Sequence, residues 1–597
     1  KDIEHSVHVE AEALGVERPL DLVTSPANVL GIELNEYAAE LARVTVWIGE
    51  LQWRLQHGYP FKQNPVLEPL DHIECRDALL IPLSGGEYAG TLWPKADAVI
   101  GNPPFVGGSK KRRELGDDVF EALATLYGSR VPPGADLVCY WFDKALQQMK
   151  RGELARAGLV STNSIRGGSN RDVLDAIVKD GEIFEAWSDE AWINDGAAVR
   201  VSLVSFLFRP NTGGEGSAAH LNGAIVEHIS SDLTSATEIN LTSAKVLGEN
   251  TLTSFQGSQK IGSFDIDGPA ARKMLSAPNP NGLSNCVVVK PSWNGLDLTR
   301  RTRDGWMIDF GTEMTQQEAA LFELPYQHIV RTVLPERQNN ARESYKKYWW
   351  RHGEPRVAMR KALSQVPRFI AVAATSKHMA FATISSAVLP DKQLIVVARA
   401  DDATFGILHS RFHELWSLRM CTWLGVGNDP RYTPTTCFET FPFPAGLTPR
   451  DTAHQRTEVL ADGAVIPADL AGDVRAHADA IARAAKRLNE LRERWLNPPE
   501  WTERVPEVIP IGMDKSPYPD RILPRSNLGA ADLAELKKRT LTNLYNQRPA
   551  WLADAHAALD AAVAAAYGWA DYSPAMTDNE ILARLLALNH ARASQNT

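Results

Sequence analysis

Ala96–Phe105, with the sequence Ala-Asp-Ala-Val-Ile-Gly-Asn-Pro-Pro-Phe, carries the residues of this chain best suited to chemistry. The amide oxygen of Asn102 can accept a hydrogen bond from an –NH2 group. Pro103 and Pro104 have no N–H group and hold φ at about −65°, so they leave backbone carbonyls as acceptors in a rigid turn. Phe105 offers a face on which a flat base can stack. The motif is suited to holding a planar –NH2 group with its nitrogen lone pair free, although a plain proline turn after a buried strand would have the same sequence.

The elements before this motif place two carboxylates at strand ends. The motif itself follows an apolar run that predicts a central strand of a parallel sheet, and sites in such sheets lie at the carboxyl ends of strands. Two further strand-like runs come earlier, Val29–Leu34 with Glu33 and His72–Leu79 with Asp77. A carboxylate at such an end can bond a ribose diol. Each acid alone would usually be a turn or N-cap residue, but two at successive strand ends favour a binding site.

Together with these neighbours, Asn102-Pro103-Pro104-Phe105 resembles the Asn/Asp/Ser-Pro-Pro-aromatic motif of amino-group DNA methyltransferases that use S-adenosylmethionine. The acidic strand ends precede the motif and a long region follows it, an order similar to that of the gamma class of adenine-N6 methyltransferases. The resemblance covers nearly the whole chain and sharpens to YeeA-like proteins and type IIL (IIG) restriction-modification enzymes. Other stretches similar to these relatives are residues 106–108, 164–171, 405–410, 431–433 and 440–444.

The resemblance implies transfer of a methyl group from S-adenosyl-L-methionine to adenine N6 of a base flipped out of double-stranded DNA, in a restriction-modification or phage-defence system. Asn102 and the Pro103 carbonyl would accept from the amine, Pro104 would complete the rigid turn and Phe105 would stack on the base. Asn at the first motif position favours adenine N6 over cytosine N4. The implied cofactor-binding residues are Glu33, Leu34, Asp77, Ala78, Asn102 and Asp136. No metal is implied, because the sulfonium already makes the methyl carbon electrophilic.

One part of the family pattern is absent from this sequence. No Gly-x-Gly turn precedes Glu33, although in the family a glycine-rich turn lets the backbone approach the methionine part of the cofactor. The chain begins Lys1-Asp2-Ile3-Glu4-His5, without an initiator Met or a signal peptide. We therefore expect an N-terminally truncated catalytic domain that lacks its first strand and part of its cofactor pocket.

The fold class expected from these elements is α/β. A Rossmann-like methyltransferase sheet with its first strand missing would be followed by an α+β target-recognition domain and a helical C-terminal region. The predicted domains are residues 1–210, 217–445 and 446–597, with a Gly-rich linker at residues 210–216. Within the first domain, Gly158–Ile165 and Val199–Arg209 are expected to be strands and Ala135–Met149 a helix. Residues 290–440 are expected to read bases in the major groove.

Binding to DNA would need a local basic surface, because the formal charge of the chain is −10. Residues 331–368 contain ten basic and three acidic residues, a difference of +7, with Tyr and Trp interleaved. Such a mixture suits phosphates and exposed bases; the alternative is a solvated basic helix with its aromatic residues packed inward. A flexible Gly107-Gly108 pair beside a basic cluster could also close over phosphates. The predicted DNA contacts are Lys110, Lys111, Arg112, Arg166, Arg337, Lys346, Lys347, Arg351 and Arg431.

Composition narrows the class of protein further. The five cysteines are scattered and form no Cys-x-x-Cys pair, which argues against a zinc site or a disulfide framework and favours a reducing, cytoplasmic location. No apolar run is long enough to span a bilayer, so no membrane partner is expected. Two other functions remain open: an Asn-Pro-Pro-aromatic enzyme acting on RNA or a protein glutamine, and a DNA-recognition subunit that is inactive as a fragment. Other restriction or defence-system subunits would be further partners.

Overall fold

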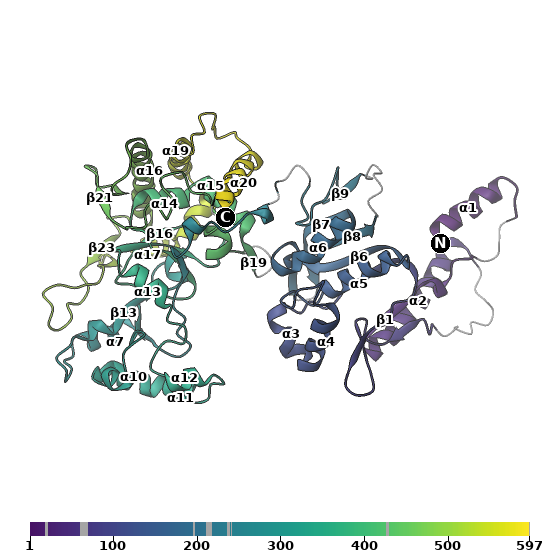
Figure 1. The fold of residues 1–597 in the computed structure, drawn as a ribbon, viewed down its shortest axis with the longest axis horizontal. Coiled ribbons are helices and arrows are strands. Elements are labelled where there is room, and N and C mark those ends of the chain that lie inside the picture. The colour runs from purple at the N-terminus through teal and green to yellow at the C-terminus, as the bar shows by residue number, and fades with distance from the viewer. Residues whose placement is uncertain are drawn as a thin grey trace. The chain divides into compact units, whose positions relative to one another are not determined.

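The computed structural model describes residues 1–17, 22–59, 70–194, 197–209, 218–235, 239, 241–424 and 429–595. The predicted linker at residues 210–216 lies outside the described residues. The chain divides into two compact units, residues 1–236 (unit 1) and 237–597 (unit 2), each described below by itself (Figure 1). The division into three domains stays a prediction.

Unit 1 is built on a six-stranded mixed sheet with the order β10-β9-β7-β8-β6-β5. Strands β5 and β6 are parallel, and β8 is antiparallel to both β6 and β7. This sheet confirms the predicted α/β class. Its strands are β5 (Ala96–Gly101), β6 (Leu154–Thr162), β7 (Gly181–Asn194), β8 (Ala197–Phe208), β9 (Ala219–Leu221) and β10 (Ala224–Val226).

Helices α5 (Cys139–Lys150) and α6 (Arg171–Asp180) pack against this sheet (Figure 1). Their apolar faces supply the core of unit 1, where the Phe142 ring of α5 stacks on Phe206 of β8 with centroids 5.7 Å apart. Helix α5 begins four residues later than the predicted start at Ala135, because residues 135–138 are not helical and the Leu137 amide donates instead to the Val106 carbonyl in the loop after β5. Helices α3 (Gly108–Leu115) and α4 (Asp117–Tyr127) precede α5 in the chain.

Strands β1 (Gly31–Glu33) and β2 (Ile73–Cys75) form a separate parallel pair. Helix α2 (Glu36–His57) follows β1 and starts where the Asn35 side chain accepts from the Ala38 amide; α1 (Asp2–Ala13) precedes it. In the described part of the chain, no strand pairs with the outer edge of β5, and the Ile100 side chain is 88% exposed. The strand that the sequence predicted as central therefore lies at the edge of the sheet formed by the described residues, where β6 is its neighbour. The hairpin of β3 (Leu80–Pro82) and β4 (Tyr88–Gly90) connects β2 to β5.

Unit 2 contains two four-stranded sheets and several helices. One sheet has the order β11 (Ser254–Gln256), β18 (Leu394–Val397), β15 (Arg368–Ala373) and β16 (Ala382–Ser385). The other has the order β12 (Asp265–Asp267), β14 (Gly305–Ile308), β13 (Val289–Trp293) and β17 (Leu389–Pro390). Short hairpins are β19 (Thr422–Leu424) with β20 (Asp429–Arg431), β21 (Thr457–Val459) with β22 (Val465–Pro467), and β23 (Thr502–Val505) with β24 (Arg521–Pro524).

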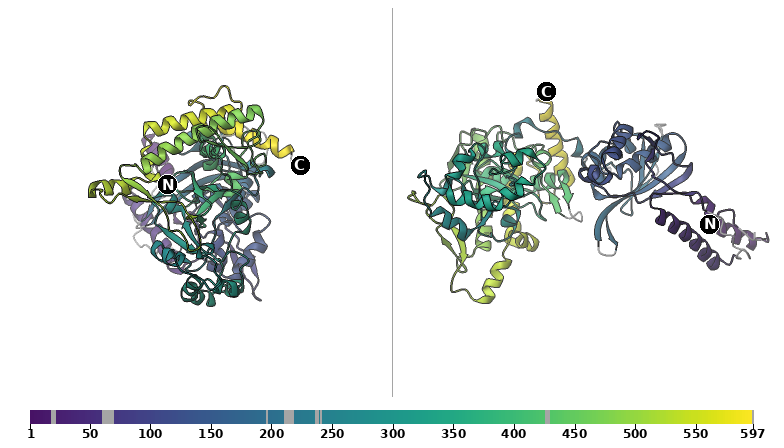
Figure 2. Two further views of the ribbon diagram at one scale, coloured as in Figure 1. Left: turned by 90° about the vertical axis from the view of Figure 1, so that its left-hand side faces the viewer. Right: turned by 90° about the horizontal axis from the view of Figure 1, so that it is seen from below.

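The C-terminal helices of unit 2 share a core with the segment before them. Helices α16 (Gly472–Leu496) and α19 (Ala550–Ala566) run side by side (Figures 1 and 2). Their residues Ile481 and Leu559 belong to one buried cluster with Phe405 of α14 (Asp402–His409). The other longer helices are α7 (Gly268–Leu275), α10 (Glu323–Thr332), α13 (Val357–Leu363), α15 (Arg411–Met420), α17 (Ala530–Lys538), α18 (Leu541–Gln547) and α20 (Asp578–Gln595). Within the described ranges, no helix combines the length and the apolar character needed to cross a membrane.

Candidate active site

The ends of β1 and β2 bring Glu33 and Asp77 to one edge of their sheet. Glu33 lies opposite Cys75 in the parallel register, and the Arg76 amide donates to the Glu33 carbonyl at 2.9 Å. Oε1 of Glu33 accepts from the Asn35 amide at 2.8 Å. Oδ1 of Asp77 accepts from the amides of Leu79 and Leu80 at 2.7 and 3.1 Å. Within the described residues, the second oxygen of each carboxylate accepts no hydrogen bond from the fold, so it can accept one from a ligand.

Backbone contacts fix the neighbours of these acids. The Leu34 carbonyl accepts from the Cys75 thiol at 3.7 Å, and the Leu34 side chain is 69% exposed. The Ala78 carbonyl accepts from the Trp93 indole at 2.9 Å. The hydroxyl of Thr91 donates to the Asp77 carbonyl, also at 2.9 Å. The segment that leads into β5 therefore holds the end of β2.

Asn102–Phe105 forms the loop at the carboxyl end of β5, next to the end of β6. Pro103 is buried, whereas Asn102 and Pro104 are exposed and Phe105 is 39% exposed. The Val106 amide donates to the Pro104 carbonyl at 3.2 Å and closes the turn. Buried Pro103 thus anchors the loop, while the side-chain amide of Asn102 and the ring of Phe105 reach the surface.

Asp136 has a different environment from the other two acids. Its Oδ1 accepts from the Gly108 amide at 2.8 Å. Its Oδ2 accepts from the Ser164 hydroxyl at 2.7 Å and from the Asn170 amide group at 2.8 Å. Both carboxylate oxygens are engaged by the fold, so the predicted cofactor contact competes with three internal hydrogen bonds.

The predicted flexible loop after Phe105 is the start of helix α3. A Cβ at Gly108 would lie 2.0 Å from the Gly134 carbonyl oxygen, so only glycine fits this close approach. Lys111 is fully buried, and its ammonium donates to the Ala135 carbonyl at 2.8 Å and to the Tyr140 hydroxyl at 3.0 Å. Burial lowers the pKa of Lys111 and raises that of Tyr140 to about 12. The predicted contact of Lys111 with DNA does not fit this enclosed position.

Three other predicted contacts in unit 1 remain nearer the surface. Lys110 is exposed. Arg112 is exposed and pairs with Glu121 and with Asp117. Arg166 is partly buried and donates to the Asp232 carbonyl at 2.8 Å. Of the three, Lys110 is the one whose ammonium bonds to no other described residue.

The basic and aromatic segment of residues 331–368 is partly internal in unit 2. Arg337 is 1% exposed and donates to the carbonyls of Lys260, Arg351 and Tyr345 at 2.9, 3.0 and 3.4 Å. The guanidinium of Arg351 donates to backbone carbonyls of residues 312–314. A DNA contact does not fit Arg337, because its guanidinium is enclosed, and Arg351 is already committed to the fold.

Most aromatic residues of the same segment pack inward, although Tyr348 is 42% exposed, and three of the predicted cations of unit 2 stay at the surface. Trp349 and Trp350 are 7% and 6% exposed. Lys346 and Lys347 are exposed, and Lys346 pairs with Glu343 at 2.7 Å. Arg431 is exposed on β20. Lys346, Lys347 and Arg431 are thus the predicted unit 2 contacts that could reach DNA.

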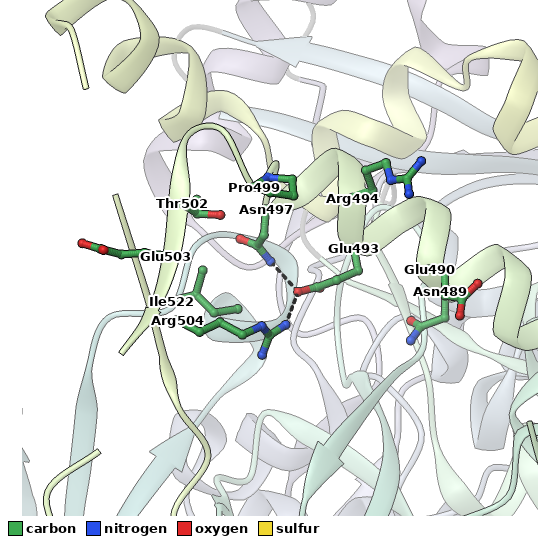
Figure 3. Close-up of a pocket in the computed structure, with 10 residues that line it drawn as sticks. All are labelled: Asn489, Glu490, Glu493, Arg494, Asn497, Pro499, Thr502, Glu503, Arg504 and Ile522. Atoms are coloured by element: carbon green, nitrogen blue, oxygen red, sulfur yellow. Dashed lines mark hydrogen bonds and ion pairs between the residues drawn. The ribbon is translucent and has the colours of Figure 1, made fainter. Parts of the chain in front are cut away.

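A cavity of about 430 Å³ lies elsewhere in unit 2, between the end of α16 and the β23–β24 hairpin (Figure 3). Figure 3 shows Asn497 and Arg504 donating to Glu493, at 3.1 and 2.9 Å. No predicted site residue lines this cavity. Among the residues that the structure describes, no group of three or more His, Cys, Asp or Glu side chains could hold a metal ion.

Two families match this chain. Residues 2–215 match the family described as MmeI, DNA-methyltransferase domain, and residues 315–445 match MmeI, target recognition domain. The chain carries an MmeI-type methyltransferase domain and an MmeI-type target recognition domain. The methyltransferase match contains Glu33, Asp77 and Asn102, and the recognition match contains Arg337 and Arg431. The predicted resemblance to type IIL enzymes is confirmed.

Similar proteins include one solved structure and one curated relative. The structure of the type IIL restriction-modification enzyme MmeI in complex with DNA has a TM-score of 0.68 and 18% sequence identity, covering 99% of this chain and 71% of that one, and so shows the same fold. DNA methyltransferase A of Bacillus subtilis (strain 168) is 27% identical over 186 residues, which are 30% of this chain and 20% of that protein. The chain thus spans a fifth of the length of this curated relative.

Proposed function

We propose that the MmeI-type methyltransferase domain transfers a methyl group from S-adenosylmethionine to adenine N6 in double-stranded DNA, at a sequence chosen by the recognition domain. The reaction would serve a cytoplasmic restriction-modification or phage-defence system. The observation that supports this most is the loop after β5, where exposed Asn102 and half-exposed Phe105 flank buried Pro103.

Asn102 and Phe105 would hold the target base in different ways. The N6 atom is not reachable inside a stacked duplex, so the base must be flipped out. The Asn102 amide oxygen and the Pro103 carbonyl would accept the two amine hydrogens, which orients the nitrogen lone pair away from the loop. Phe105 would stack on the ring and keep it from rotating. The chain then acts by fixing the angle of approach rather than by acid–base chemistry.

Glu33 and Asp77 fit the cofactor because each presents a carboxylate oxygen beyond its internal hydrogen bonds. Glu33 would accept from ribose hydroxyls, as acids at strand ends do in dinucleotide-binding folds. Asp77 and the adjoining backbone of Ala78 would face the adenine part. When bound, S-adenosylmethionine supplies a methyl carbon that its sulfonium makes electrophilic.

The test is Asn102→Ala in the full natural chain, with methylation assayed on plasmid DNA, ribosomal RNA and protein. We expect plasmid methylation by the natural protein and its loss in the variant, while DNA affinity measured by fluorescence anisotropy stays within about twofold. Phe105→Ala should reduce the rate, whereas Phe105→Tyr and Phe105→Trp, which keep a stacking face, serve as matched controls and should retain it. Near-normal methylation by Asn102→Ala would refute the site, and methylation of only RNA or protein would refute the substrate.

A further inference from the structure

The Asp136 carboxylate lies where three segments of unit 1 meet. It accepts from Gly108 at the start of α3, from Ser164 after β6, and from Asn170 before α6. These three donors are 28, 28 and 34 residues away in the sequence. Asp136 therefore joins the carboxyl ends of β5 and β6, which are neighbouring parallel strands.

On the β5 side, residues 135–137 hold residues 106–111 through three hydrogen bonds. The Leu137 amide donates to the Val106 carbonyl at 2.9 Å, next to the bond from Gly108 to Asp136. The buried Lys111 ammonium adds the bond to the Ala135 carbonyl. The loop with Asn102 and Phe105 is thus fixed by β5 at one end and by this contact at the other.

On the β6 side, Asn170 pairs with Asp136 through two hydrogen bonds. Its Nδ2 donates to Oδ2 of Asp136 at 2.8 Å, and its Oδ1 accepts from the Asp136 amide at 2.7 Å. Asn170 is 7% exposed, and its Nδ2 also lies 3.1 Å from the Ser164 hydroxyl. Any displacement of residues 164–170 is therefore passed to Asp136 and, through it, to Gly108.

We propose that Asp136 is a positioning residue for methyl transfer: it sets the orientation of the Asn102–Phe105 loop and couples it to the loop of residues 164–170. This rests on the proposed function. A cofactor ligand needs a carboxylate oxygen directed at the ligand, whereas both oxygens of Asp136 receive donors from the fold. Glu33 and Asp77 hold the cofactor in this scheme, and Asp136 acts through Gly108.

The pairing of Asp136 with Asn170 can be tested by exchanging the two side chains between the two positions. Asp136→Asn keeps an acceptor for Gly108 but sets an –NH2 group against the –NH2 group of Asn170. Asn170→Asp sets two carboxylates against each other. The double variant Asp136→Asn/Asn170→Asp restores one donor, one acceptor and one negative charge, and its acid still accepts from the backbone amide of residue 136.

Three measurements on the full natural chain separate the roles: hydrogen exchange of residues 102–115, the single-turnover methylation rate, and calorimetric affinity for S-adenosylmethionine. We expect each single variant to speed exchange and to lower the methylation rate about ten- to a hundredfold, the effect of losing a hydrogen bond to a charged group. Affinity for S-adenosylmethionine should change less than about threefold. The double variant should regain most of the exchange protection and most of the rate.

Several results would overturn the proposal. Unchanged exchange in residues 102–115 of both single variants would show that Asp136 does not hold the loop. Lost cofactor affinity with unchanged exchange would make Asp136 a cofactor ligand instead. A double variant that recovers neither quantity, including one that fails to fold, would refute the pairing. If the unmodified protein methylates no substrate, the proposed function fails; if it methylates and the single variants keep its rate, only the positioning role fails.

Discussion

Gly108→Ala is the sharpest test of how the loop after Phe105 is held. The added Cβ would lie 2.0 Å from the Gly134 carbonyl oxygen and 2.8 Å from its carbon, closer than real Cβ atoms come. The backbone of α3 must therefore move away, and the 2.8 Å bond from Gly108 to Asp136 is lost with it. Overpacking costs about 1–3 kcal/mol, and a hydrogen bond to a charged group contributes about 1.5–3 kcal/mol. The two costs are not fully additive, because a single backbone movement relieves the clash and breaks the hydrogen bond together. We therefore expect the free energy of unfolding to fall by about 3 kcal/mol.

For a unit of this size, that loss corresponds to a fall of about 6–12 °C in the Tm of unit 1, measured by scanning calorimetry, together with reduced methylation. Gly107→Ala is the matched control. Gly107 has φ −65° and ψ 145°, which alanine adopts readily, and its Cβ would come no closer than 3.7 Å to Oδ1 of Asp136. If Gly108→Ala melts within 2 °C or so of Gly107→Ala, close packing of the two segments is refuted.

Four further predictions concern unit 2. Arg337→Met removes the guanidinium donor from the carbonyls of Tyr345 and Arg351 and leaves the Lys260 carbonyl with the Gly353 amide, so it should cost about 2–4 kcal/mol in urea unfolding. Lys347→Met, on the exposed side of the same segment, should cost under about 0.5 kcal/mol; equal costs would contradict the buried role. Lys346→Ala with Lys347→Ala should weaken DNA binding at every sequence and reduce the slope of log K against log salt by about 2 at most, and an unchanged slope would exclude these lysines as phosphate contacts. Burial raises the pKa of Asp560 to about 6. The protonated carboxyl therefore stabilises the fold below the unfolded pKa near about 4, and this contribution is lost as the pH rises through about 6. Asp560→Asn should flatten the fall in unfolding free energy between pH 4 and 7.5 by up to about 3 kcal/mol, and a pH profile identical to that of the natural protein would refute the raised pKa. Replacing residues 290–440 with those of a relative should change which sequence is methylated, and retention of the original site would place recognition elsewhere.

Local sequence patterns predicted the strands and helices that carry the site. The apolar run that ends at Gly101 predicted β5, and the predicted strand Gly158–Ile165 overlaps β6, which starts four residues earlier and ends at Thr162. The predicted strands in turn placed Glu33 and Asp77 at neighbouring strand ends, on one edge of the sheet. These features depend on residues within a few positions of each other, so one sequence is enough to predict them.

The roles of Gly108 and Asp136 depend on contacts that are distant in the sequence. A Gly-Gly pair beside lysines and arginines indicates flexibility when read alone, but here Gly134 lies against Gly108 and excludes any side chain. Asp136 was predicted from its place at a helix start, and its three donors come from segments 28 or more residues away. Ser164 and Asn170 belonged to a polar stretch similar to that of the relatives, but nothing in that stretch indicated that both would bond to one acid.

The basic segment of unit 2 shows why net charge predicts a DNA surface poorly. The net charge of +7 counts the cations of the segment but not the groups that accept their hydrogen bonds. The acceptors of Arg337 and Arg351 are backbone carbonyls, which carry no formal charge. A guanidinium with five donors can satisfy several backbone carbonyls at once. Neighbouring Trp349 and Trp350 are buried beside these turns. Arginines that alternate with buried aromatic residues are thus expected to stabilise loops from within, whereas exposed lysines of this segment, such as Lys346 and Lys347, stay accessible to phosphates.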